Sequence, residues 1–149
     1  MVDEVPAVLI RGGTVVTMDA RRAVGKLDVV VGGDGRIAAV ASPGSGGAER
    51  GAQRVIDATG RVVVPGLVQA HLHLCQTLNR GLAEDLHLLR WLRERTWPLE
   101  AAHDPDSLAA AARLGIAELL LGGTTALLDI GTVHHHDVVF EAARDAGIR

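Results

Sequence analysis

The sequence changes character at Pro65-Gly66, and this change constrains the fold more than any other feature. Before it, short aliphatic runs alternate with glycine-rich turns, as in "LDVVVGGDGRIAAVA" from Leu27 to Ala41, which is typical of β-hairpins. After it, strand patterns alternate with helix patterns, which implies right-handed βαβ units and a parallel sheet. We therefore predict an α/β chain with an all-β part over residues 1–63 and two βα units over residues 64–149.

Several element boundaries follow from local signals. Residues 7–18 read as two short strands around Arg11-Gly12-Gly13, and residues 42–53 read as a loop. The run "GLVQAHLHL" from Gly66 is a continuous apolar strand of the kind that parallel sheets bury on both faces.

Two helices are expected in the second part. Asp104 and Pro105 predict an N-cap and a first helical residue, and Gly122-Gly123 ends that helix. Asp137 predicts the N-cap of a second helix that Gly147 closes.

Bulk composition argues against several classes of partner. The formal net charge is −3 and the basic residues form no stripe, so nucleic acid is not expected to bind. No apolar stretch reaches the roughly 18 residues that a membrane span needs. Cys75 is the only cysteine, which excludes an intramolecular disulfide and favours a cytoplasmic location. Asp3 and Glu4 replace the basic start of a signal peptide, so none is expected.

Two histidines end the apolar strand that follows Pro65-Gly66. His71 and His73 are two residues apart, so in a strand they point to the same face with Cα atoms roughly 6.5 to 7 Å apart. Two imidazoles on this spacing can converge on one cation at about 2.0 to 2.1 Å. Active sites of parallel α/β proteins lie at such strand ends. The pair is therefore a candidate metal site, although two partly buried histidines without a metal show the same pattern.

The stretch "DATGRVVVPGLVQAHLHL", from Asp57 to Leu74, resembles the entry into the barrel of the amidohydrolase superfamily. The opening "LIRGGTVVTMD" and the hairpin "VVVGGDGRIAAV" resemble the N-terminal half-sandwich of that superfamily. The run "QTLNRGLAEDLHLLRWLRERTWPLEAAH", from Gln76 to His103, resembles the branch of deaminases that act on S-adenosylhomocysteine, methylthioadenosine and 5'-deoxyadenosine. Guanine deaminases and triazine chlorohydrolases are relatives of that branch.

The resemblance implies a fold and a chemistry. The fold is a small β-sandwich half-domain followed by the N-terminal part of a (β/α)8 barrel. The chemistry is hydrolytic deamination of an adenine nucleoside with one divalent metal, zinc or alternatively iron, that lowers the pKa of a bound water toward neutrality. His71 and His73 match the first two metal ligands. Glu100 matches a carboxylate that binds the ribose hydroxyls, and a homo-oligomer is expected for the whole enzyme.

Trp91 is a further substrate-binding candidate, since it can line the nucleoside pocket, but it can equally pack as a core residue beside Leu88 and Leu92. Glu100 in turn can be a solvated residue near a helix start. Asp129 can orient a ligand histidine or hold the next loop by a hydrogen bond.

Other polar residues are expected to be structural. Cys75 is predicted to pack, and His87 and His103 are predicted to lie on the surface. The three histidines at 134–136 are predicted to form a solvated loop. The remaining metal ligands and the proton shuttle of the superfamily belong to later strands, so the 149 residues alone are expected to be inactive.

Two alternatives stay open at this stage. The first keeps the superfamily but changes the substrate to guanine, 8-oxoguanine or a chlorotriazine, which Glu100 argues against because these substrates lack a ribose diol. The second is a non-catalytic metal-binding fragment. An unpaired apolar strand edge argues against it, because such an edge promotes aggregation.

Overall fold

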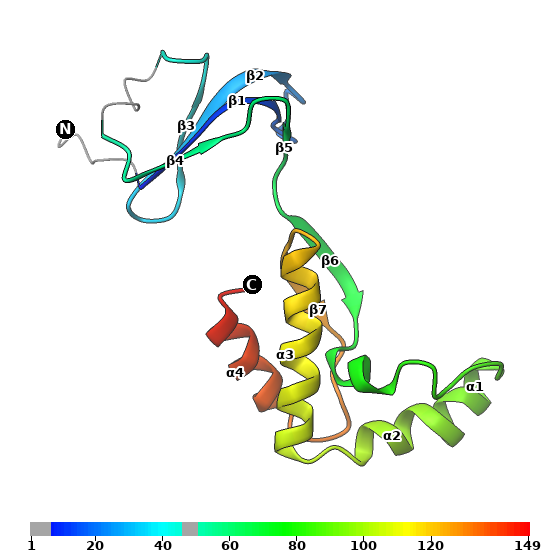
Figure 1. Ribbon diagram of the computed structural model, residues 1–149. Coiled ribbons are helices and arrows are strands. Elements are labelled where there is room, and N and C mark those ends of the chain that lie inside the picture. The colour runs from blue at the N-terminus through cyan, green and yellow to red at the C-terminus, as the bar shows by residue number, and fades with distance from the viewer. Residues whose placement is uncertain (1–6, 46–50) are drawn as a thin grey trace. The chain divides into compact units, whose positions relative to one another are not determined.

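The computed structural model describes residues 7–45 and 51–149, and the chain divides into two compact units (Figure 1). The first unit ends at Pro65 and the second runs from Gly66 to Arg149. Part of the predicted 42–53 loop lies outside the described residues. The described helices include none with the length and apolarity needed to cross a bilayer.

The first unit is a single five-stranded sheet. Its strands are β1 (Val8–Val16), β2 (Val24–Val31), β3 (Ile37–Ala41), β4 (Arg54–Asp57) and β5 (Val62–Val63). β1 pairs antiparallel with β2 and parallel with both β4 and β5, while β3 pairs antiparallel with β2. The buried hydrophobic residues of this unit are all small or aliphatic, namely Leu9, Val15, Val29, Val30 and Ala58. β1 is thus the central strand of an open sheet and has neighbours on both sides.

The prediction of two short strands over residues 7–18 was wrong, because β1 runs through the glycines as one strand. The pairing partners step from Ile10–Val29 to Gly13–Leu27, so β1 carries one extra residue at this point. This is a β-bulge. Gly12 adopts a φ of +73° and donates its backbone N–H to Asp28 Oδ1 at 3.0 Å, which satisfies the group that the bulge removes from the ladder.

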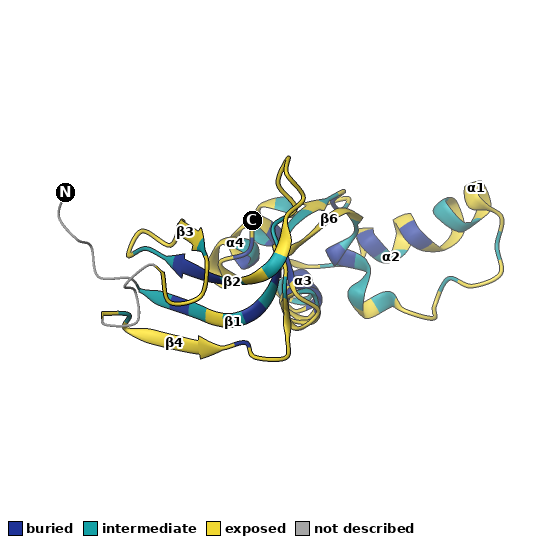
Figure 2. Cartoon of the chain, turned by 90° about the horizontal axis from the view of Figure 1, so that it is seen from above, coloured by how far each residue is buried: buried dark blue, intermediate teal, exposed yellow. Residues whose placement is uncertain are grey.

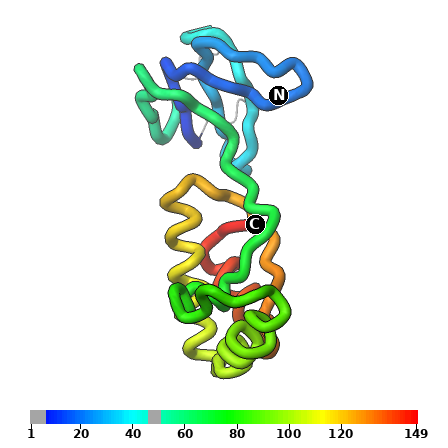
Figure 3. Tube along the Cα trace, turned by 90° about the vertical axis from the view of Figure 1, so that its right-hand side faces the viewer, coloured from blue at the N-terminus to red at the C-terminus, as the bar shows by residue number. Residues whose placement is uncertain are grey.

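The second unit contains two parallel strands and the helices between and after them. The strands are β6 (Leu67–Leu72) and β7 (Thr124–Asp129). Between them lie a 3₁₀-helix (Leu74–Asn79), α1 (Leu88–Trp91), a π-helix (Leu92–Thr96), α2 (Trp97–Ala101) and α3 (Pro105–Leu121); α4 (His136–Ala146) follows β7. Leu108, Ala112 and Ile116 of α3 form the core with Leu74, Val139 and Ala142, so α3 and α4 pack together with the start of the 3₁₀-helix (Figure 3).

The prediction that the strand from Gly66 is buried on both faces was wrong for this chain. Leu67 is 58% exposed and Val68 is 70% exposed, and Figure 2 colours β6 mainly as exposed. The reason is that β7 is the only strand that pairs with β6 within the described residues. The two strands nevertheless approach closely, since a Cβ added to Gly66 would lie 2.7 Å from Thr125 Cβ.

The helix boundaries agree with the sequence signals in all but one case. Asp104 caps α3 through a reciprocal capping box with Ser107, and Gly147 ends α4 in the left-handed conformation. Asp137 is not the N-cap of α4. The helix begins at His136, two residues before the start that an Asp137 cap would give. His135 occupies the cap position with a φ of +61° and no side-chain hydrogen bond, and Asp137 lies in the first turn.

Candidate functional site

The two candidate metal ligands lie side by side at the end of β6. The ring centroids of His71 and His73 are 5.3 Å apart and the ring planes are inclined by 73°. With a metal–nitrogen bond of about 2.0 to 2.1 Å, two imidazoles at a tetrahedral angle have centroids about 5.2 Å apart. The separation of the two rings is therefore compatible with one shared cation. No group of three or more metal-binding side chains is present in residues 7–45 and 51–149, so the pair alone would not complete a four-coordinate shell.

Asp129 at the end of β7 holds the backbone that follows the histidines. Its Oδ1 accepts the backbone N–H of Leu74 at 2.8 Å, and its Oδ2 accepts that of Gly131 at 3.1 Å. His136 Nε2 lies 3.2 Å from the same Oδ2, and the Asp129 side chain is only 7% exposed. None of the hydrogen bonds found in the described chain joins Asp129 to His71 or His73. The structure therefore favours the loop-holding alternative for Asp129.

A continuous helical run from Leu88 to Ala101 supplies the facing wall of the site. The run passes from α1 through the π-helix into α2, so its middle turn has i→i+5 geometry. Trp91 and Thr96 are five residues apart across the π-turn, and Thr96 and Glu100 are four residues apart in the following α-turn. These spacings place all three side chains on one face of the run.

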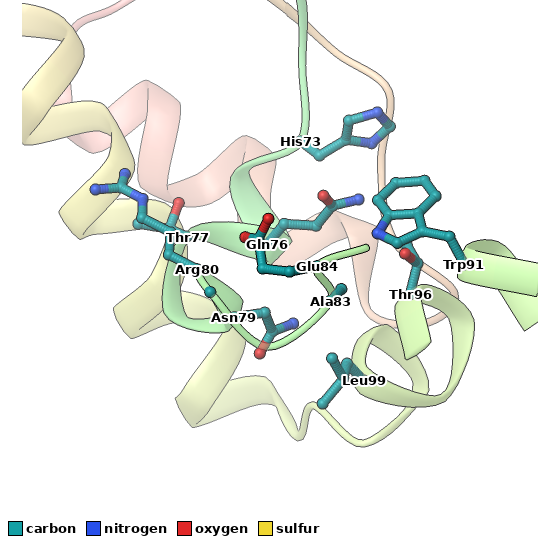
Figure 4. Close-up of a pocket in the computed structure, with 11 residues that line it drawn as sticks. His73, Gln76, Thr77, Asn79, Arg80, Ala83, Glu84, Trp91, Thr96 and Leu99 are labelled. Carbon is teal, nitrogen blue, oxygen red and sulfur yellow. The ribbon is translucent and has the colours of Figure 1, made fainter. Parts of the chain in front are cut away.

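This face borders two neighbouring cavities of about 300 Å³ each. We name the first the Glu100 cavity. It is lined by His73, Gln76, Trp91, Leu92, Thr96, Trp97, Glu100, Ile130, Gly131, Thr132 and Val133. We name the second the Asn79 cavity, which shares His73, Gln76, Trp91 and Thr96 with the first (Figure 4). One candidate metal ligand and both candidate substrate-binding residues thus border one space.

Glu100 is buried, which rules out the reading of it as a solvated residue. It is 7% exposed, and its Oε1 accepts a hydrogen bond from Gln76 Nε2 at 2.8 Å. It has no cationic partner among the described residues. Burying a carboxylate with so few partners is unfavourable, and such a group is suited to accept further hydrogen bonds from a ligand.

Trp91 is half-buried and lies outside the hydrophobic core of the second unit. Leu88, one α-turn before it, is 67% exposed, so the expected packing of Trp91 beside that residue has no buried environment around it. The position of Trp91 on the cavity wall favours the pocket-lining alternative.

The sequence matches a known protein family. The profile of the Amidohydrolase family matches residues 62–149, which include β6, the candidate metal ligands His71 and His73, and all the described helices. The chain belongs to the amidohydrolase family.

Individual relatives of this amidohydrolase chain match nearly all of it. A 5-methylthioadenosine/S-adenosylhomocysteine deaminase of Symbiobacterium thermophilum is 40% identical over 95% of the chain. The structure superposes on a zinc-bound adenosine deaminase of Xanthomonas campestris with a TM-score of 0.82 and 34% identity, over 95% of this chain and 32% of that one. An atrazine chlorohydrolase of Arthrobacter aurescens, solved with zinc, gives 0.81 and 32% identity over 95% and 34% of the two chains. The amidohydrolase chain spans 32% of the length of the Symbiobacterium relative.

The other histidines of the amidohydrolase chain, and its cysteine, differ in how far they are exposed. His87, His134 and His135 are exposed, as predicted. The prediction of a solvated loop was wrong for His136, which is half-buried, begins α4 and has its Nε2 3.2 Å from Asp129 Oδ2. His103 is not a surface residue, because it is half-buried and its Nε2 lies 2.8 Å from the Cys75 carbonyl oxygen. Cys75 is fully buried in the core, and burial together with nearby Glu100 raises the pKa of its thiol to about 12.

Sequence reasoning missed most residues of the cavity walls, among them Gln76, Thr96 and Thr132. Gln76 follows His73 by three residues, which in the 3₁₀-helix after β6 is one turn, but a single glutamine gives no recognisable signal. Thr96 and Thr132 come from separate segments, and only the three-dimensional fold brings them to the same cavity.

Proposed function

We propose that these residues form the N-terminal part of a metal-dependent amidohydrolase that deaminates an adenine nucleoside hydrolytically. Residues 1–63 are the half-sandwich portion, and residues 64–149 are the first two βα units of a (β/α)8 barrel. The observation that carries the proposal is the shared cavity of His73, Trp91 and Glu100. The deaminase names of the relatives from Symbiobacterium thermophilum and Xanthomonas campestris agree with it.

The metal site of the proposal fits the residues present. His71 and His73 would be two of its ligands, with zinc as the first candidate and iron as the second. A bound divalent metal supplies a water acidic enough to attack at neutral pH. The hydrogen bond from the Leu74 backbone N–H to Asp129 Oδ1 fixes the chain directly after His73, and the rings of His71 and His73 lie 5.3 Å apart.

The substrate site uses Trp91 and Glu100. A half-buried indole offers a flat apolar surface on which an adenine ring can stack. The buried carboxylate of Glu100 can accept from two adjacent ribose hydroxyls, while Gln76 fixes its orientation by donating to Oε1. We therefore propose a small adenine nucleoside as the substrate. Separately, we propose that the whole enzyme is a homo-oligomer in the cytoplasm.

The test uses a chimera that joins residues 1–149 to the remaining two thirds of the Symbiobacterium relative. Glu100→Ala should lower kcat/KM for adenosine and 5'-deoxyadenosine, because a charge-assisted pair of hydrogen bonds is lost. The expected loss of transition-state stabilisation is about 2 to 4 kcal/mol. The loss should be much smaller for free adenine. Glu94→Ala is the matched control, because Glu94 lies in the same helical run with its side chain 51% exposed.

The outcome also separates the competing functions. An equal effect on nucleosides and adenine, or none on either, would exclude a ribose role for Glu100. Activity on a chlorotriazine or guanine should then be measured, since the atrazine chlorohydrolase of Arthrobacter aurescens resembles the chain nearly as well. A chimera that binds metal but turns over none of these compounds would favour the non-catalytic alternative.

A further inference from the structure

Two buried hydroxyl groups on the wall of the Glu100 cavity have no hydrogen-bond partner in the described protein. They are Thr96 Oγ1 and Thr132 Oγ1. Thr96 is only 5% exposed, so bulk solvent does not satisfy its hydroxyl. Buried polar groups are almost always hydrogen-bonded, so two unpartnered hydroxyls on residues that line one cavity need a partner that the described protein does not supply.

The backbone explains why Thr96 keeps its hydroxyl free. A threonine within an α-helix commonly donates its hydroxyl to the carbonyl of the residue four positions earlier. Thr96 ends the π-helix Leu92–Thr96, and no such hydrogen bond forms. Its side chain lies with those of Trp91 and Gln76 at the Asn79 cavity (Figure 4), and these three residues also line the Glu100 cavity.

Thr132 reaches the same cavity from a different part of the chain. It follows β7 and Gly131, whose backbone N–H is held by Asp129 Oδ2 at 3.1 Å and whose carbonyl accepts from Cys75 Sγ at 3.0 Å. Both backbone polar groups of Gly131, the residue before Thr132, are therefore hydrogen-bonded, which fixes the start of this loop. The two threonines therefore line one cavity from two segments that are far apart in the sequence.

We propose that Thr96 and Thr132 are specificity-determining residues that hydrogen-bond the ribose of the bound nucleoside next to Glu100. This inference rests on the proposed function. A carboxylate only accepts hydrogen bonds, whereas a sugar also presents oxygens that need donors, and threonine hydroxyls donate as well as accept. The position of Thr96 one helical turn before Glu100 places it beside the carboxylate assigned to the sugar.

The experiment compares Thr96→Val, Thr132→Val and the double variant in the chimera. Each change replaces the hydroxyl by a methyl group and leaves the side chain nearly the same size. We expect KM for adenosine to rise roughly five- to tenfold per hydroxyl, with kcat little changed, and KM for free adenine to stay the same. Calorimetric titration of the metal-free chimera with adenosine should show the same fold-loss in affinity.

Stability and conservative variants separate a ligand role from a structural one. Because neither hydroxyl has a protein partner, the valine variants should melt at the parental temperature or above. Thr96→Ser and Thr132→Ser keep the hydroxyl and should retain adenosine binding. Thr125→Val is the matched control, since Thr125 is an exposed threonine of β7 that lines neither cavity.

Three results would overturn the inference. Unchanged adenosine affinity in the double valine variant, with Glu100→Ala still impaired, would show that the hydroxyls only hold water and would leave the proposed function standing. Equal losses for adenosine and adenine would place the hydroxyls at the base instead of the sugar. Failure of Glu100→Ala to affect nucleosides would remove the proposed function itself.

Discussion

The two units of the chain differ in chemistry as sharply as in topology. All seven histidines, both tryptophans, the phenylalanine and the cysteine lie after Pro65, and the first unit contains none of them. The first unit buries a small aliphatic core under a sheet whose central strand is paired on both sides. All candidate site residues thus lie in the second unit, and the first unit contributes only a folded sheet.

The units also differ in how far they use their own hydrophobic residues. β1 alternates between buried and more exposed positions, as expected for a strand with one face on a core. β6 has no fully buried residue although most of its residues are apolar. The apolar faces of β6 thus contribute less to the stability of this chain than the same residues would in a complete parallel sheet.

The largest predicted effect concerns the metal and the second unit alone. His71→Ala or His73→Ala in the chimera should weaken metal binding by more than a hundredfold, because even the loss of a residue that only supports a ligand costs about 10- to 100-fold. Metal content after gel filtration would measure the effect. His87→Ala, an exposed histidine of the same unit, should keep its metal. Full metal content in both ligand variants would break the assignment.

A second prediction tests whether the units are also separate in stability. Leu108 and Leu9 are 0% and 1% exposed, one in each core, so replacing either by alanine should cost about 2 to 5 kcal/mol of unfolding free energy. Amide hydrogen exchange should show Leu108→Ala lowering protection in α3 and α4, and Leu9→Ala lowering it in β1 and β2. Loss of protection across both units from either substitution would show that they unfold together.

The smallest predicted effect is a pH dependence confined to the second unit. The pKa of the buried Cys75 thiol is raised from 9.0 to about 12, mainly by burial and next by the charge of Glu100. Between these values the unfolded chain releases the proton and the folded chain keeps it, so stability falls as pH rises above 9. Denaturant midpoints from pH 8 to 11 would measure the slope.

Cys75→Ala should remove this component of the slope, although it lowers stability at every pH by emptying part of the core. The folded protein should also resist thiol reagents at pH 8, because the thiolate is the reactive form. Rapid labelling of Cys75 under native conditions would contradict the burial.

The sequence predicts the parts of the site that depend on local spacing and leaves out those that depend on tertiary contact. The i, i+2 spacing of His71 and His73 requires only a strand to bring their rings together, and the rings do lie side by side. The capping signal at Asp104 is equally local and is confirmed. The start of α4 was misplaced because Asp137 is a good cap by composition, whereas His136 is held by Asp129 from a different element.

The bulge in β1 and the exposure of β6 show the same limit at the level of the fold. A pair of glycines indicates a break in a strand, but whether the strand stops or bulges is decided by the neighbour, here Asp28 of β2. The apolar run of β6 specifies a strand suited to burial, while actual burial depends on which strands lie beside it. The hydroxyls of Thr96 and Thr132 are invisible in the sequence for the same reason.

The π-helix gives the site a dependence on chain length as well as on side-chain identity. Its turn holds one residue more than the α-helical turns on either side. If the same residues formed a regular α-helix throughout, Trp91 would rotate by about 100° relative to Glu100. The indole would then leave the cavity although every side chain assigned to the substrate remained in the sequence. Deleting one residue from the π-turn would instead keep the two side chains aligned in an unbroken α-helix, so chain length and π-helical geometry must change together if the pocket is to be preserved.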